Sequence, residues 1–275
     1  PICPVERLFS GFADVRMFGA KPIGDTDTDG FDSTAAIQLA LGSKNSVISG
    51  GGLRYAVKAC RVPSFKIVCD MDLLTLPGAV PAEFWSPMTI GAHGDQTLTE
   101  AVTFENIRVN GNRVLNGANA VGQSEDGGRH GFRVIGNARK LRFINCDAEY
   151  CGSYGFFFYR GLNTAPIPFQ DIPTISDVKL INCNSRWNKS HGGAADSIKD
   201  FVIYGGEYTY NGLDYQTDPG ALTLGGSAYS NAWDFEGYGI GSYIGNVTVR
   251  NADLRFNAAS SILIQDPVSV SEPRF

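Results

Sequence analysis

The sequence lacks a basic excess and has no long apolar run. Its 275 residues carry 23 Lys and Arg against 28 Asp and Glu, for a formal net charge of −5. A nucleic-acid-binding surface normally needs clustered basic residues, so we expect no nucleic acid partner. No run approaches the roughly 18 to 20 apolar residues of a membrane-spanning helix, which predicts no membrane span. Residues 1–10 lack the basic start and apolar centre of a secretory signal peptide, so no signal peptide is visible in this chain.

Cysteine and histidine are scarce as well. The six cysteines form no Cys-x-x-Cys pair and are too thinly spread for a disulfide-stapled miniprotein, which favours buried free thiols. The three histidines show no His-x-x-x-His spacing, so a zinc site is not expected. His130 lies in a Gly-rich stretch, for which a surface position is the default. We therefore predict no metal and no cofactor.

Convincing helices are missing after Leu41, where short runs of β-branched and aromatic residues recur between Asn, Gly and Asp. Such punctuation is typical of strands and turns. Four of these runs can be aligned on the residue that follows the first expected strand of each run. The aligned residues form one column, with spacings of 37, 23 and 46 residues: Asn145, Asn182, Gly205 and Asn251. Six residues later comes a second column: Cys151, Asn188, Asn211 and Asn257. The repeat predicts a solenoid of stacked β coils, with both columns forming ladders of amide hydrogen bonds between coils.

The same spacing predicts the organisation of the chain. Between residues 45 and 266 we expect roughly nine or ten coils, about 4.8 Å apart. The steps of 37 and 46 residues require loop insertions, near 160–174 and 225–243. We expect residues 1–44 to form an N-terminal strand, over 12–20, and a capping helix. Residues 45–275 would then form the solenoid.

The stretch GDTDTDGFDSTAAIQ (24–38) carries alternating acids like the first half of a calcium-binding EF-hand loop. Such a loop needs a bidentate carboxylate at its twelfth residue, which is Ala36 here. The acids instead suit a turn followed by a short helix, Thr34–Leu41, capped by Asp32 or Ser33. The sequence leaves room for a weak structural calcium ion at these acids, and we do not expect one.

The segment 12–41 resembles the opening of pectate-lyase-like right-handed β-helix proteins. The shared features are a strand ending in Asp-Val-x-x-Phe-Gly-Ala, a loop with Gly-Asp, and Asp-Ser-Thr-Ala-Ala-Ile-Gln on a capping helix. Phage tailspike depolymerases, polygalacturonase-like enzymes and mannuronan C-5 epimerases share this pattern. The resemblance implies an all-β fold, namely a single-stranded right-handed parallel β-helix with an N-terminal capping helix.

The middle of the chain is more distantly similar to the catalytic module of the epimerases, through NIRVNGNR (106–113), GSYGFFFYR (152–160) and HGGAAD (191–196). The resemblance places Tyr154 at the family's catalytic Tyr and Asp196 at a catalytic Asp. Phe157 and Tyr159 stand where the family has its other catalytic Asp and its His. These two departures argue against proton abstraction by that mechanism.

Candidate acid–base residues come from the alignment of successive coils. It places Tyr154 above His191, His191 above Asp214, and Tyr159 above Asp196, with neighbours in a column about 5 Å apart. Hydrolysis of a sugar chain commonly uses two carboxyl groups. The catalytic candidates are Asp196, Asp214, Asp218, His191, Tyr154 and Glu207. Asp147 and Glu149 alternate along one strand, and we expect both to face solvent.

Aromatic and basic side chains supply the candidates for binding a sugar chain. Sugar faces stack on aromatic rings, and a lyase would also need a cation, from Arg160 or Lys189, to neutralise a uronate carboxylate. The substrate-binding candidates are Tyr159, Arg160, Trp187, Lys189, Trp233 and Tyr238.

The combined interpretation is a carbohydrate-active β-helix protein, similar to a tailspike depolymerase. It would bind a bacterial polysaccharide (capsule, O-antigen or exopolysaccharide) and cleave it as an endo-glycosidase with paired carboxylates. Two alternatives stay open: a polysaccharide lyase or C-5 epimerase acting on a uronate polymer, and a non-catalytic glycan-binding adhesin. Resemblance to tailspikes also implies a homotrimer and a location outside the cell or in a virion tail.

Overall fold

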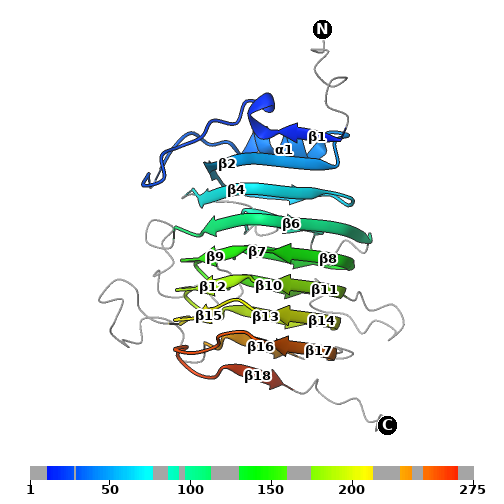
Figure 1. Cartoon of the computed structure of the whole chain (residues 1–275), viewed down its shortest axis with the longest axis vertical. Helices are drawn as coiled ribbons and strands as arrows, with labels where there is room; N and C mark the ends of the chain where they lie inside the picture. Colours follow the sequence, from blue (N-terminus) through cyan, green and yellow to red (C-terminus); the bar gives the residue numbers. More distant parts are fainter. Residues whose placement is uncertain are drawn as a thin grey trace.

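A computed structural model describes residues 11–27, 29–76, 86–92, 97–112, 130–159, 175–212, 230–236 and 244–265. They form a right-handed parallel β-helix in which all pairings between named strands are parallel. Strands of successive coils stack along the long axis, and the helix α1 (Thr34–Gly42) lies near the N-terminal end (Figure 1). The predicted fold class is confirmed.

Each coil contributes strands to as many as three faces. Sheet A runs in the order β1 (Phe12–Asp14), β2 (Val47–Val57), β4 (Ile67–Thr75), β6 (Thr99–Asn110), β8 (Ala138–Ile144), β11 (Ile175–Ile181), β14 (Ile198–Tyr204) and β17 (Ile244–Arg250). The third face continues from the end of β6 through β9 (Asp147–Glu149), β12 (Asn184–Arg186) and β15 (Tyr208–Thr209). Sheet B consists of β3 (Cys60–Val62), β5 (Met88–Ile90), β7 (Phe132–Ile135), β10 (Phe156–Tyr159), β13 (Gly193–Asp196), β16 (Trp233–Glu236) and β18 (Ile262–Gln265).

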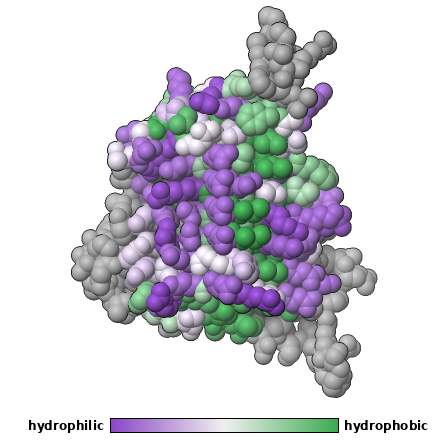
Figure 2. All heavy atoms as spheres, in the orientation of Figure 1, coloured by the Kyte–Doolittle hydropathy of each residue, from purple (hydrophilic) through white to green (hydrophobic). Residues whose placement is uncertain are grey.

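The core lies between these faces and follows from the alternation along each strand. In β8, Leu141 and Phe143 are fully buried, and their partners in β11 and β14 are buried as well. Sheet B adds rings, so that Phe132, Phe143 and Phe156 pack with centroids 5.0 to 5.8 Å apart. Each such side chain stabilises the fold by about 1.5 to 3 kcal/mol on burial. The polar surface in turn forms columns along the long axis, with a narrow hydrophobic column among them (Figure 2).

The first predicted column marks a sharp turn of the backbone after sheet A. Asn145, Asn182, Gly205 and Asn251 stand in register and have φ values of 50°, 51°, 70° and 56°. Asn and Gly are the residues that tolerate this left-handed conformation best. Asn145 Nδ2 donates to Asn106 Oδ1 of the preceding coil at 3.2 Å. Backbone geometry, more than an amide ladder, therefore explains this column.

The second column is the predicted amide ladder. Asn188 Nδ2 donates to Asn211 Oδ1 at 2.9 Å, and Asn211 Nδ2 donates to Asn257 Oδ1 at 2.9 Å. The Oδ1 of Asn188 accepts from the backbone N–H of Cys151 at 2.9 Å. Asn188 and Asn211 are completely buried, so each amide replaces water for backbone groups of the turn.

Three organisational predictions need correction. Sheet A has seven strands between residues 45 and 265 in the described part of the chain, not nine or ten. The step between paired residues of successive coils varies from 18 residues (Leu53 to Met71) to 46 residues, so one constant short period overestimates the number of coils. The strand expected over 12–20 ends at Asp14, and a 3-10 helix follows, Val15–Phe18. Part of the insertion expected at 225–243 is strand β16, whereas 160–174 lies outside the described residues.

The acidic stretch forms turns and a helix start, as expected. Asp27 Oδ2 accepts from the N–H of Gly24 at 2.7 Å, and Asp32 Oδ1 accepts from the N–H of Thr34 at 3.0 Å. Ser33 does not cap the helix with its side chain, because its Oγ accepts from the N–H of Lys21 at 3.1 Å. Within the described residues, no helix is both long and apolar enough to cross a membrane.

We expect Asn211→Ala to lower the free energy of unfolding by roughly 2 kcal/mol or more, because buried donors and acceptors lose their partner. Asn211 serves the Asn188 amide, the Ser185 carbonyl and Asn257 at once. Urea unfolding measures the change. Asn45→Ala, which removes one 3.3 Å side-chain contact to Ser43, is the control and should change stability by under about 0.5 kcal/mol. Equal effects of both substitutions would contradict a structural role for the ladder.

Candidate functional site

The outer face of sheet B carries buried polar side chains. Side chains alternate along its strands, and Phe132, Phe156 and Trp233 point inward. The residue that follows each of them therefore points away from the core. One outward row crosses four strands in register: Arg133, Phe157, Ala194 and Asp234. Arg133 and Asp234 are only 6% and 2% exposed. Buried ionisable groups are costly, so they mark candidate functional sites.

Three rings stack where successive coils enter this face. His130 and His191 lie on either side of Tyr154, each with its ring centroid 5.2 Å from that of Tyr154. Phe157 packs on the same stack, 4.5 Å from His130. The predicted placement of Tyr154 above His191 is confirmed. The surface position expected for His130 is wrong, because its ring is fully buried at the head of the stack.

His191 is oriented through both ring nitrogens. Its Nδ1 accepts a hydrogen bond from the backbone N–H of Asn231 at 2.8 Å, so this nitrogen carries no proton. In the neutral ring the proton is then on Nε2, which lies 3.5 Å from Asp234 Oδ2. Both side chains are at most 5% exposed. The backbone of one coil thus selects the tautomer that faces the carboxylate of Asp234.

Burial also lowers the pKa of two basic groups of this site, His130 and Arg133. Desolvation holds the pKa of His130 well below its usual value, and the nearby charge of Arg133 adds to this. Desolvation lowers the pKa of Arg133 to about 10, although Tyr159 acts in the opposite direction. At neutral pH, therefore, Arg133 is charged and His130 is neutral. One guanidinium charge consequently lies in a site with little water, where its field is weakly screened.

Asp196 and Asp234 point outward from the adjacent strands β13 and β16. Asp234 pairs with Ala194, and Asp196 pairs with Glu236, so the two aspartates lie one strand and two residues apart. Parallel strands spaced about 4.8 Å apart, with a rise of about 3.3 Å per residue, give a Cα separation of about 8 Å. Asp196 is 4% exposed, and its Oδ1 accepts a hydrogen bond from Ser197 Oγ at 3.2 Å. Two carboxyl-bearing residues this close on one face can both reach a single bound group. We call His130, Arg133, Tyr154, His191, Asp196 and Asp234 the sheet B cluster.

The structure brings several of the predicted residues together here. Tyr159 lies directly above Asp196 in the register of β10 and β13, as expected. The position one coil beyond His191 is held by Asn231, not by the predicted Asp214. The remaining candidates of this region lie outside the described residues: Asp214, Asp218, Arg160 and Tyr238.

Three other candidates lie on or beside the third face. Glu207 precedes β15, and its Oε2 accepts from Arg186 Nη1 at 3.0 Å. Trp187 follows β12 and stacks on Tyr210, with centroids 4.4 Å apart. Lys189 is half-buried in the turn between β12 and β13, where its backbone N–H donates to Cys151. These residues are not part of the sheet B cluster.

Trp233 is a core residue, which corrects its prediction as a binding residue. It is fully buried and packs against Phe158, Phe201 and Phe235 with centroid distances of 5.4 to 6.3 Å. On the adjacent strand, a Cβ at Gly193 would come within 2.5 Å of the indole, so glycine is required there. The alternation Trp233-Asp234-Phe235 was the signal in the sequence for a strand with Asp234 pointing outward. The same alternation, with Phe132 pointing inward, predicts that Arg133 points outward.

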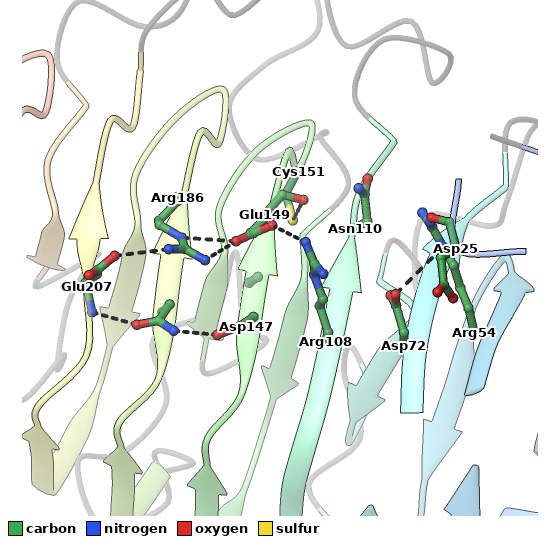
Figure 3. A network of polar contacts seen from close by, with 12 residues as sticks. Asp25, Arg54, Asp72, Arg108, Asn110, Asp147, Glu149, Cys151, Arg186 and Glu207 are labelled. Carbon is green, nitrogen blue, oxygen red and sulfur yellow. Dashed lines mark hydrogen bonds and ion pairs between the residues drawn. The ribbon is translucent and has the colours of Figure 1, made fainter. Parts of the chain in front are cut away.

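A second polar network covers the third face (Figure 3). Glu149 is 5% exposed and binds Arg108 at 3.0 Å as well as Arg186, so its predicted solvent position is wrong. Asp147, which points to the same face, accepts from Asn184 Nδ2 at 2.6 Å. Burial raises the pKa of Asp147 and also that of Asp72 further along the network. Across the described residues, no three His, Cys, Asp or Glu side chains are grouped so as to hold a metal ion.

Comparisons with known proteins support the fold. No family model and no curated protein matches the chain. Among solved structures, ORF18 of Geobacillus virus E2 aligns with a TM-score of 0.54 and 15% identity over 90% of this chain, which spans about half (49%) of that one. The A-module of the mannuronan C-5 epimerase AlgE4 from Azotobacter vinelandii aligns at 16% identity over 92% of this chain and 74% of its own, with a TM-score of 0.48. Tailspike protein 3 of bacteriophage CBA120 aligns at 11% identity over 94% of this chain and 62% of its own, with a TM-score of 0.22. At such identities the likeness is one of fold alone, and the alignment with ORF18 agrees with the parallel β-helix described above.

Acidification should destabilise the protein through His130. Because its folded pKa lies below the unfolded value of about 6.5, the unfolded chain takes up the proton first, and stability falls by up to about 1.4 kcal/mol per pH unit below that value. His130→Gln removes this term, so its melting temperature should fall less between about pH 7 and pH 5 than that of the wild type. Parallel pH profiles for the two proteins would contradict a neutral, buried His130.

Proposed function

We propose that this chain is a carbohydrate-active enzyme that binds and hydrolyses a bacterial surface polysaccharide, as a tailspike-like endo-glycosidase. The observation that carries the proposal is the pair of buried carboxyl groups, Asp196 and Asp234, on adjacent strands of the outer face of sheet B. Their Cα atoms are about 8 Å apart by register, so both side chains can reach one substrate, as the paired carboxyl groups of glycosidases do.

The surroundings of the two aspartates suggest their roles. The Nε2–H of His191 faces Asp234, and a donated hydrogen bond favours the carboxylate form, which a general base needs. Asp234 would take a proton from the attacking water as that water bonds to the anomeric carbon. Asp196 would act as general acid and protonate the leaving sugar oxygen as the glycosidic bond breaks. The anomeric configuration inverts, because water and leaving group occupy opposite faces.

Aromatic side chains beside the pair supply contacts for a sugar ring. Tyr159 and Phe157 are half-buried on the same outer face, with their rings stacked at 5.6 Å, and Tyr159 lies in register with Asp196. Aromatic faces bind the apolar side of a sugar while its hydroxyl groups remain free for hydrogen bonds. Tyr159 is therefore the residue proposed to position the sugar next to the general acid.

A second candidate function is proton abstraction from a uronate polymer, by a lyase or a C-5 epimerase. The observation that favours it is the buried Arg133 on the same outward row as Phe157 and Asp234. A guanidinium in a poorly hydrated site can neutralise a substrate carboxylate, which acidifies the adjacent carbon. Tyr154 and His191, stacked at 5.2 Å, would be the acid–base groups.

The proposal includes a homotrimer that acts outside the cell or in a virion tail. Both features follow from the resemblance of residues 12–41 to the opening of tailspike proteins. Light scattering on the purified protein measures the oligomer directly.

Asp196→Asn and Asp234→Asn should each lower the rate of polysaccharide cleavage by about 10²- to 10⁴-fold, the usual contribution of one general acid or base. The assay measures new reducing ends and product mass on capsule, O-antigen and exopolysaccharide preparations. Asp200→Asn is the matched control. Asp200 is exposed on sheet A, where it accepts from Asn246 Nδ2 at 2.7 Å, and this substitution should leave the rate unchanged.

Three outcomes would contradict hydrolysis by this pair. Full activity of both variants would rule out these catalytic residues. Ultraviolet absorbance from an unsaturated uronate product would establish a lyase. A wild-type protein that binds polysaccharide but cleaves none would be an adhesin.

A further inference from the structure

A column of aromatic residues runs along the solenoid at the turn after the third face. Its members are Tyr150, Trp187, Tyr210 and Phe256, which follow β9, β12, β15 and the bridge at Asp253, in register from coil to coil. The stacking of β9, β12 and β15 in Figure 1 gives the direction of this aromatic column. Trp187 and Tyr210 are nearly parallel at 4.4 Å, and Tyr210 and Phe256 are nearly parallel at 5.1 Å.

These rings remain partly accessible. Phe256 is 53% exposed, and the other three residues are half-buried. Parallel rings in contact are separated by about 3.5 Å, so centroid distances of 4.4 and 5.1 Å mean that each ring is displaced sideways from the next. In this parallel-displaced arrangement each ring covers only part of the next one, so ring edges and parts of the ring faces remain at the surface.

Backbone strain shows that stability alone does not explain these aromatic residues. All four adopt left-handed backbone angles, with φ of 54° at Tyr150 and 59° at the other three. Bulky residues rarely adopt this conformation, whereas Asn and Gly adopt it easily. The neighbouring left-handed column of the same coils uses Asn145, Asn182, Gly205 and Asn251. The same coils therefore form an equivalent turn with residues that tolerate the left-handed conformation. Strained residues concentrate at sites where proteins bind ligands.

The charged groups beside the aromatic column are mostly held in ion pairs. Glu149 binds Arg108 and Arg186, Glu207 binds Arg186, and Asp253 binds Arg255. Three carboxylates thus meet three guanidinium groups, and Asp147, in register with Glu207, adds a fourth carboxylate that accepts from Asn184; several of these residues are drawn in Figure 3. A surface without a positive excess gives an acidic polymer or a nucleic acid no electrostatic advantage. It offers many hydrogen-bond donors and acceptors, which suit hydroxyl groups.

We propose that the aromatic column and these ion pairs form a binding surface for a neutral polysaccharide extended along the solenoid axis. Rings recur once per coil, about 4.8 Å apart, a distance comparable to the length of one sugar unit in an extended chain. Each sugar would meet one ring edge and one flanking ion pair. The inference adds a second binding surface, separate from the sheet B cluster, and it requires binding and not cleavage. The turn from Trp187 to Gly192 joins this surface to His191, so a bound chain would be held beside the sheet B cluster.

The test is native electrophoresis of the full chain in gels containing hydroxyethylcellulose, dextran, a galactomannan or alginate. We expect a neutral polymer to retain the wild type, and Trp187→Asn to weaken this retention on the order of tenfold. Asn suits the left-handed backbone, so the variant should stay folded. Trp187→Tyr keeps a ring and should keep retention. Tyr204→Asn, which removes a 47%-exposed aromatic from sheet A, is the matched control and should behave as the wild type.

Fluorescence gives a second measurement that does not depend on gel mobility. Trp187 is the half-buried tryptophan of the described residues, whereas Trp233 is fully buried, so a glycan on the aromatic column should change emission in the wild type and not in Trp187→Tyr. Unchanged retention of a folded Trp187→Asn overturns the proposal, as does retention of the wild type by alginate alone or by no polymer. A change of oligomeric state in Trp187→Asn, without loss of retention, would assign the column to subunit contact. If Asp196→Asn and Asp234→Asn retain full cleavage, the proposed catalytic pair fails while this inference stands.

Discussion

The backbone hydrogen bonds that join each coil to the next in parallel register are the constraint on which this structure depends. They place equivalent residues of successive coils about 4.8 Å apart, so every side chain has a neighbour of known sequence position above and below it. A buried polar residue is tolerated where that neighbour completes its hydrogen bonds, as Asn188, Asn211 and Asn257 show. Without the register these amides would be buried and unsatisfied, at a cost of several kcal/mol in sum.

Columns that hold the solenoid together differ in character from the columns that we assign to function. Structural columns repeat one chemistry, such as inward aliphatic side chains, ladder amides, or Asn and Gly at the left-handed turn. The outward row of sheet B instead changes at every coil, from Arg133 to Phe157, Ala194 and Asp234. A row without like neighbours adds nothing to the stacking of coils, yet it places unlike groups within reach of one substrate. The aromatic column is an intermediate case, since its rings stack well but strain the backbone.

Sequence reasoning located much of the fold and part of the candidate site. The spacings of 37, 23 and 46 residues gave the true register of the later coils, and with it the pairs Tyr154–His191 and Tyr159–Asp196. It overestimated the number of coils because step length is not constant. Sequence reasoning also placed Trp233 in a loop, because the four-residue strand β16 is flanked by Gly-rich segments that are typical of loops. That error hid Asp234, the carboxylate opposite His191.

The sequence by itself determined the repeat, the parallel pairing that the repeat requires, the helix start at Thr34 and the turn positions. Each of these depends on local conformational preference or on spacing along the chain. Only the tertiary structure decided which polar residues are buried and what they face. Asn231 comes to lie beneath His191, and Glu149 lies between two arginines. These contacts join residues about 40 positions apart through loops of unequal length, and no local preference encodes such lengths. Burial then sets the charge state of groups such as His130, because desolvation acts only once the coils have stacked.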